Sequence, residues 1–302
     1  MANTIKKGIQ YYLKRIADAL AGIKTDAKVS VLEDILGITL DPDLDEKYYQ
    51  YFTIEATEDG TKVYFRQSSI AADESLDPLK VEVSTDNGET WTEVTAAPAE
   101  DDVPGATLAE LDEGDKVLIR GKNDAYGYYS EGEGEGIENC NFFADKPCYV
   151  YGNIMSLVGG DDFARLRKVK EYAFAYLFSD YDGELDWSWV LSKEGEELLL
   201  PATTLASYCY NSMFYGCTGL TSAPELPATT LASNCYNGMF YGCGNLAYIK
   251  AMFTTTPGSA YTNNWVNGVK ATGIFVKNSA ATWDVTGNNG VPTGWTVETA
   301  SN

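Results

Sequence analysis

Thiol groups are the side chains whose spacing in this sequence most suggests a chemical site. The stretch LPATTLASYCYNSMFYGC begins at Leu200, and LPATTLASNCYNGMFYGC begins at Leu226. Each copy holds two cysteines eight residues apart, namely Cys209 and Cys217 in the first and Cys235 and Cys243 in the second. Such thiols could bind a soft metal ion, form disulfides or fill a hydrophobic core.

The spacing favours buried thiols over a metal site or disulfides. Zinc ligands usually lie about two to five residues apart, and a separation of eight without histidine does not match that pattern. Stacked copies would instead place small core residues in ladders, and the expected ladder residues are Cys209, Cys217, Cys235, Cys243, Phe214, Phe240, Leu200 and Leu226. Cys140 and Cys148, outside the copies, are the better disulfide candidates, although proteins made in a cytoplasm seldom form one. We therefore expect no metal and no cofactor.

The absence of histidine argues against an enzyme. It excludes Ser–His and Cys–His nucleophile pairs and removes the commonest general base near neutral pH. Four carboxylates lie close together in the sequence, but no spacing among them singles out a glycosidase pair: Glu184, Asp186, Glu194 and Glu196. The acidic run at residues 131–136 lacks the ligand order of a calcium loop, and we interpret it as a mobile loop. We expect no catalytic residue.

One short motif resembles an Asp box, a turn found in sialidase-type propellers and elsewhere. It reads S-x-D-x-G-x-T-W, and its key residues are Ser84, Asp86, Gly88 and Trp91. In such a turn the Ser and Asp side chains bond the backbone, Gly adopts a positive φ and Trp covers the hairpin. The motif occurs once here, without the regular recurrence of a propeller. We therefore expect a structural hairpin and not a sialidase.

The charge is strongly negative and unevenly distributed. The net charge is −22 in 302 residues, with −18 in residues 50–163 and +4 in residues 1–28. The acidic middle would repel nucleic acid and anionic membranes. No apolar run reaches the roughly 18 residues that a membrane span needs. We expect no nucleic-acid partner and no membrane insertion.

Residues 1–45 are expected to form a helical segment for oligomerisation or docking. Apolar residues recur at alternating spacings of four and three, as in a coiled-coil seam, and they include Ile5, Ile9, Tyr12, Ile16 and Ile23. The alternative is an amphipathic helix that packs on its own chain. A secretory leader is not expected, because Lys14 and Arg15 interrupt the place of an apolar core.

Residues 46–160 are expected to form an acidic, Ig-like β-sandwich. Short stretches rich in Val, Ile, Thr and Tyr alternate with Gly- and Asn-containing turns. The strand candidates are YYQYFTIEA, TKVYFRQ, LKVEVS, TWTEV, KVLIRGK and CYVYG. Turn-separated strands over about 100 residues are typical of an antiparallel sandwich.

Residues 161–302 are expected to form stacked repeats with a C-terminal cap. Residues 200–220 and 226–246 are identical at 17 of 21 positions, with a period of 26 residues. A weaker copy around Phe174 stands 36 residues upstream, which indicates an insertion of ten near residues 182–193, and another lies around Trp265. Degraded terminal copies are expected where a stack must present a polar end.

The repeats resemble the BspA-like leucine-rich repeat, in which a helical A-F-x-x-C element alternates with a short strand ending in L-P. Cys209-Tyr210 and Cys235-Tyr236 stand at its A-F positions, and Cys217 and Cys243 at its Cys. The closing GIFV and GVPTGW segments are similar to a variant of gut Bacteroidetes and their phages. The resemblance covers roughly residues 50–302. It implies a leucine-rich-repeat solenoid that follows the β-sandwich. Together with the helical segment expected from the apolar spacing of residues 1–45, the expected fold class is α+β multidomain.

This resemblance implies adhesion, since members of the family are mostly surface proteins. The expected function is a bacteriophage virion structural protein, a head fibre or decoration protein at the virion surface. The chain would form a homo-oligomer such as a trimer. Its other partners would be a capsid or other virion protein and a host surface glycan or protein. The alternative is a bacterial cell-surface adhesin whose leader is missing from this sequence.

Overall fold

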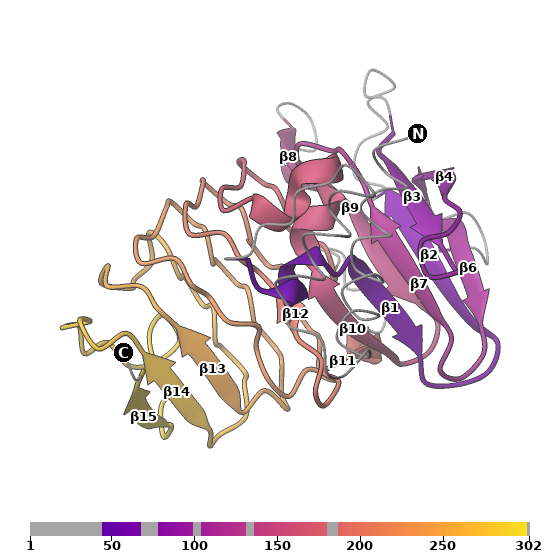
Figure 1. Ribbon diagram of the computed structural model, residues 1–302. Coiled ribbons are helices and arrows are strands. Elements are labelled where there is room, and N and C mark those ends of the chain that lie inside the picture. Colours follow the sequence, from indigo (N-terminus) through magenta and orange to yellow (C-terminus); the bar gives the residue numbers. More distant parts are fainter. Residues whose placement is uncertain (1–43, 68–77, 99–103, 131–135, 180–186, 301–302) are drawn as a thin grey trace, which may run out of the picture.

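The computed structural model describes residues 44–67, 78–98, 104–130, 136–179 and 187–300 (Figure 1). Within these ranges the chain consists of β-strands, turns and short 3₁₀ helices. The 3₁₀ helices are η1 (Glu46–Tyr49), η2 (Ile154–Leu157), η3 (Gly160–Arg165) and η4 (Trp187–Trp189). None of the described helices is long and apolar enough to cross a bilayer.

The first sheet is mostly antiparallel and is centred on strands with alternating apolar residues. Its order is β11 (Val190–Leu191), β10 (Cys148–Asn153), β1 (Phe52–Ala56), β7 (Lys116–Arg120), β3 (Lys80–Ser84) and β4 (Thr92–Thr95), and β12 (Leu198–Leu199) also pairs with β10. Phe52 and Ile54 on β1, like Val117 and Ile119 on β7, are fully buried. This period of two puts one face of the sheet into the core.

The second sheet faces the first. It contains β5 (Ala97–Pro98), β2 (Thr61–Gln67), β9 (Gly136–Ala144) and β8 (Gly127–Ser130), with β6 (Ala106–Leu111) also paired to β2. Phe142 of this sheet lies 5.4 Å from Phe52 of the first and 5.1 Å from Phe65, measured between ring centroids. The contact between Phe142 and Phe52 joins the two sheets. Figure 1 shows both sheets at the N-terminal end of the molecule.

The repeats form a ladder in which each copy is one layer, or rung, stacked on the next. The four rungs lie around Phe174, Phe214, Phe240 and Trp265, and each has a turn side and a side with short strands or bridges. In each rung, alternate backbone N–H groups donate to the next rung: Phe174 to Cys209 at 2.8 Å, Tyr210 to Cys235 at 3.0 Å and Phe240 to Trp265 at 2.8 Å. The N–H groups between them donate within their own rung, as Asn211 does to Tyr208 at 3.1 Å. The backbone is thereby satisfied without a helix.

Recurring left-handed residues explain why these segments are not helical. Tyr176, Ser212, Gly238 and Asn264 stand at equivalent positions and have φ of 54°, 49°, 61° and 51°. A right-handed helix cannot contain such residues, because its φ is about −63°. The sequence pattern thus specifies a chain of turns.

On the other side of each rung short strands stack in parallel. The third sheet contains β13 (Tyr248–Ala251), β14 (Ile274–Lys277) and β15 (Thr296–Thr299) in that order. Phe275 of β14 is fully buried beneath it, against Trp265 and Trp283. Figure 1 places this sheet at the C-terminal end.

The expected fold class is therefore wrong. The described chain is mostly β, contains no α-helix and has open sheets, and it forms neither the helix-and-strand repeats of the resemblance nor a closed solenoid. The physical reason is that each rung contains residues with positive φ, which prevent a helix, and that its N–H groups donate hydrogen bonds to the next rung. The predicted helical segment with Ile5, Ile9, Tyr12, Ile16 and Ile23 lies outside the described residues, which begin at Leu44.

One hydrophobic cluster runs from the two sheets into the repeats. Phe52 of β1 lies 5.7 Å from Phe178 of the first rung, and Tyr126 lies 6.4 Å from Phe174. Aromatic stacking then continues from rung to rung, with Phe178 on Phe214 at 5.3 Å and Phe214 on Phe240 at 5.6 Å. The sheets thus cover the N-terminal end of the repeat ladder.

Candidate functional site

The four repeat cysteines lie in the core. Cys209, Cys217, Cys235 and Cys243 are fully buried, and none is in a disulfide. The thiol of Cys217 donates to the carbonyl of Phe178 at 3.3 Å, and that of Cys243 to the carbonyl of Phe214 at 3.0 Å. The thiols of Cys217 and Cys243 therefore bond the rung before their own.

Burial keeps these thiols protonated. It raises the pKa of Cys235 to about 12 and the pKa of Cys217 well above its usual range. Because only the thiolate is a good nucleophile and metal ligand, burial makes these groups poor nucleophiles and metal ligands at neutral pH. Cys140 and Cys148 are likewise buried and free, with the pKa of each raised to about 12 by burial.

The remaining ladder residues are also inside. Leu200 and Leu226 are buried at the strand side of their rungs, and Phe214 stacks on Phe240. The structure thus places every predicted ladder residue in the core of the repeats.

The Asp-box residues form the turn between β3 and β4. Asp86 accepts hydrogen bonds from the hydroxyls of Ser84 at 2.6 Å and Thr90 at 2.5 Å, and these bonds lower its pKa to about 2. Gly88, with φ of 90°, donates to Ser84 Oγ at 2.8 Å. Trp91 donates to the carbonyl of Gly88 at 3.1 Å. All of these acceptors and donors are used within the turn, so the motif is structural.

The strand side of the ladder is interrupted at one place. β12 pairs with β10, and the segment 222–226 pairs with β13 through bonds from Ala223 and Leu226. Between residues 198–201 and residues 222–227 the described chain has no backbone hydrogen bond. Three residues in these edges are prolines without an N–H: Pro201, Pro224 and Pro227.

The described part of the insertion lies at this interruption. β11 and the residues around it pack against Gly219, where a Cβ would meet the carbonyl oxygens of Ser188 at 2.5 Å and Val190 at 2.6 Å. The next copy has Asn245 at the position of Gly219. This difference between the copies therefore makes room for the insertion.

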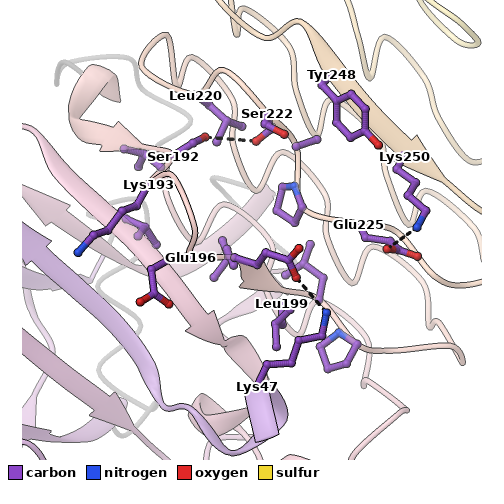
Figure 2. A pocket seen from close by; sticks show the side chains of 18 of the residues that line it. Lys47, Ser192, Lys193, Glu196, Leu199, Leu220, Ser222, Glu225, Tyr248 and Lys250 are labelled. Atoms are coloured by element: carbon purple, nitrogen blue, oxygen red, sulfur yellow. Dashed lines mark hydrogen bonds and ion pairs between the residues drawn. The ribbon is translucent and has the colours of Figure 1, made fainter. Parts of the chain in front are cut away.

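A groove of 380 Å³ opens at the interruption (Figure 2). Its two sides are the segments 190–201 and 220–227, and Lys47 of η1 and Tyr248 of β13 also line it. Its apolar lining includes Leu199, Leu220 and the three prolines. The turn side of the same rungs stays closed by the inter-rung hydrogen bonds.

The charged groups of the groove are largely paired. Lys47 Nζ lies 3.0 Å from Glu197, and Lys250 Nζ lies 2.9 Å from Glu225. The hydrogen bond from Lys47 to Glu197 raises the pKa of Lys47.

Lys193 forms an ion pair with Glu55 of the first sheet, in which its Nζ lies 2.6 Å from Glu55 Oε1. Burial opposes ionisation of Glu55, but the hydrogen bonds from Lys193 and Tyr151 lower its pKa. Among the described lining residues, Glu196 is the carboxylate that has no ion pair.

Only two of the four acidic candidates, Glu194 and Glu196, lie within the described residues. Glu184, Asp186 and the acidic loop at 131–135 lie outside the described residues, Glu194 is exposed, and Glu196 lines the groove. Within the described ranges no group of three or more Cys, Asp and Glu residues is arranged to hold a metal ion.

The groove was not predicted from the sequence. Two signals could have located it: the insertion of ten residues between the first and second rungs, and the prolines on both sides of the resulting gap. Comparison of the chain with protein families, with curated proteins and with solved structures gave no match.

Proposed function

We propose that this chain is a structural protein of a bacteriophage virion, a surface fibre or decoration protein that displays its repeat region for weak binding to the host surface. The observation that supports this most is the continuous core that joins the sheets to the repeat ladder. A ladder bonded between rungs and fixed to a sheet support is a stiff body for display, and the groove gives it a place to bind.

The chemical composition supports binding rather than catalysis. The chain has no histidine, and its described thiols are buried and protonated. The net charge of −22 disfavours nucleic acid and anionic membranes as partners. The resemblance of the repeat sequences to BspA-like adhesins also supports a binding function.

Display on a particle would make weak binding useful. Many copies on one surface convert weak single sites into strong attachment, by a factor of about 10²–10⁴ for linked sites. In this proposal residues 1–45 mediate assembly of a homo-oligomer such as a trimer and its docking on a capsid or other virion protein.

The location can be tested directly. Phage particles purified from cells that carry the gene should contain the chain by mass spectrometry, and antibodies against residues 164–302 should label intact particles in electron micrographs. Deletion of residues 1–28 should remove the chain from the particles while leaving it folded.

A different location would overturn the proposal. If the chain is absent from purified particles and fractionates with the bacterial envelope, it is a cell-surface adhesin. If the deletion leaves both the mass of the oligomer and its recruitment unchanged, the docking role of the N-terminal segment is wrong.

A further inference from the structure

We propose that the groove at the interruption of the ladder binds a neutral oligosaccharide. This inference deepens the proposed function and rests on it for the biological role of the ligand, whereas binding itself is a property of the isolated chain. The groove volume of 380 Å³ lies within the range of small-molecule sites, which is about 300–1,000 Å³.

The charge of the groove favours a neutral ligand. The ammonium groups of Lys47 and Lys250 are bonded to Glu197 and Glu225, so an anion would have to displace a carboxylate from each of them. Glu196 adds a carboxylate without an ion pair, and the whole chain carries −22. An anionic ligand is therefore repelled, while ion-paired side chains can still exchange hydrogen bonds with hydroxyl groups.

The lining combines these polar groups with apolar surfaces, as sugar rings require. A pyranose has an apolar C–H face and a rim of hydroxyls. Tyr248 is 36% exposed and offers its ring, and Pro227, which is half-buried, offers a flat apolar face. Figure 2 shows Ser192, Ser222 and Glu225 along the same groove, where they can receive or donate hydrogen bonds.

An added peptide strand fits the groove less well. Strand addition needs an accessible backbone edge with free donors and acceptors. The residues of the nearest edge, Leu198, Leu199 and Leu200, are only 9%, 9% and 2% exposed, so their backbone is covered. Proline on both sides further reduces the number of donors. Recognition must therefore use side chains.

The ligand can continue onto the third sheet. Tyr248 pairs in register with Ile274, and Ile274 with Thr296, so these three side chains form one row across the sheet. Ile274 is 37% exposed. This row extends the apolar surface from the groove toward the C-terminal end of the chain, which favours an oligosaccharide over a single sugar.

The test measures binding of the purified full chain to a panel of neutral tri- to hexasaccharides of glucose, mannose, galactose and N-acetylglucosamine, by NMR titration. Sialylated oligosaccharides and a basic proline-rich peptide are the comparison ligands. At least one neutral oligosaccharide should bind, with little change in affinity when the salt concentration is raised tenfold, because no net charge is involved.

Matched variants locate the site. Tyr248→Ala and Glu196→Gln should each weaken binding by about tenfold, since the first removes the ring and the second the unpaired carboxylate. The controls are Tyr215→Ala, an equally exposed tyrosine on the turn side, and Glu194→Gln, an exposed neighbour outside the groove lining. Both controls should bind like the natural sequence, and circular dichroism verifies that every variant is folded.

Three results would overturn the inference: no neutral oligosaccharide bound at millimolar concentration, binding that Tyr248→Ala and Glu196→Gln leave unchanged, or selective binding of the peptide. Failure of this experiment leaves particle localisation unaffected, so the two proposals can fail separately.

Discussion

At the scale of single residues, Tyr210 places a phenol hydroxyl inside the core of the repeats. Tyr210 is 1% exposed, and among the described residues its hydroxyl has no hydrogen-bond partner. The equivalent position of the upstream rung is Phe174, whose ring stacks on Tyr210 at 5.7 Å. The hydroxyl therefore costs stability, because its desolvation is not compensated.

Tyr210→Phe should raise the free energy of unfolding by about 1 kcal/mol, since it removes an unsatisfied buried hydroxyl and keeps the ring. Urea denaturation followed by circular dichroism measures the change. Tyr241→Phe is the control, because Tyr241 is only half-buried and should show almost no change. A loss of stability in Tyr210→Phe would mean that the hydroxyl has a partner after all.

Asp86 predicts a pH dependence. Its folded pKa of about 2 lies below the ordinary value of 3.8, so its ionised form is favoured by folding. The stability that it contributes is complete above about pH 4 and is lost as the pH falls toward 2. The melting temperature of Asp86→Asn should therefore lie below that of the natural sequence at pH 6, and the two should approach each other by pH 2. An unchanged difference between pH 6 and pH 2 would contradict this.

At the scale of elements, the rungs of the ladder must fit one another. Ser212 and Gly238 are equivalent positions in consecutive copies, and both have a positive φ. A Cβ at Gly238 would lie 2.7 Å from the Oγ of Ser212. A side chain at Gly238 would therefore require the Ser212 hydroxyl to move, which agrees with the glycine in this copy.

Gly238→Ser should lower the free energy of unfolding by about 1–2 kcal/mol, because it adds a left-handed residue with a Cβ. The double variant Ser212→Gly/Gly238→Ser should recover most of this loss, since it only exchanges the two residues between rungs. Chemical denaturation of both single variants and the double variant forms a cycle that tests the coupling. A double variant no more stable than Gly238→Ser would show that the two positions are independent.

At the scale of the whole molecule, the shared core makes the sheets and the repeats one folding unit. Repeat ladders often unfold in parts, because each repeat contacts only its neighbours. Here Phe52 of the first sheet contacts Phe178 of the first rung, and the aromatic stack continues through Phe214 to Phe240. A loss of packing in the repeats should therefore also lower the stability of the sheets.

Phe240→Ala should lower the free energy of unfolding by about 3–5 kcal/mol, because the ring is fully buried. Hydrogen exchange measured by mass spectrometry should become faster in β1 and β7 as well as in the repeats, since both open in one transition. Faster exchange confined to the repeats would show that the ladder unfolds by itself.

The local sequence pattern was sufficient to predict several strands and the repeat period of this protein. The predicted strand segments TKVYFRQ, LKVEVS, TWTEV, KVLIRGK and CYVYG overlap β2, β3, β4, β7 and β10, respectively, and miss only the last residue of β4 and of β10. Alternating apolar residues specify strands because side chains alternate between the two faces of a sheet. The period of 26 residues and the copies around it were likewise visible in the sequence, since each rung buries the same side chains.

The tertiary structure alone decided how the rungs are built and where a ligand could bind. The segment around Cys209 was predicted as a helix. In the structure its residues with positive φ interrupt any helix, and alternate backbone N–H groups donate to the next rung. These hydrogen bonds exist only when the rungs are stacked. The groove likewise arises from the alignment of an insertion with prolines of a neighbouring rung. These residues are distant in the sequence, so only the stacking of rungs brings them together.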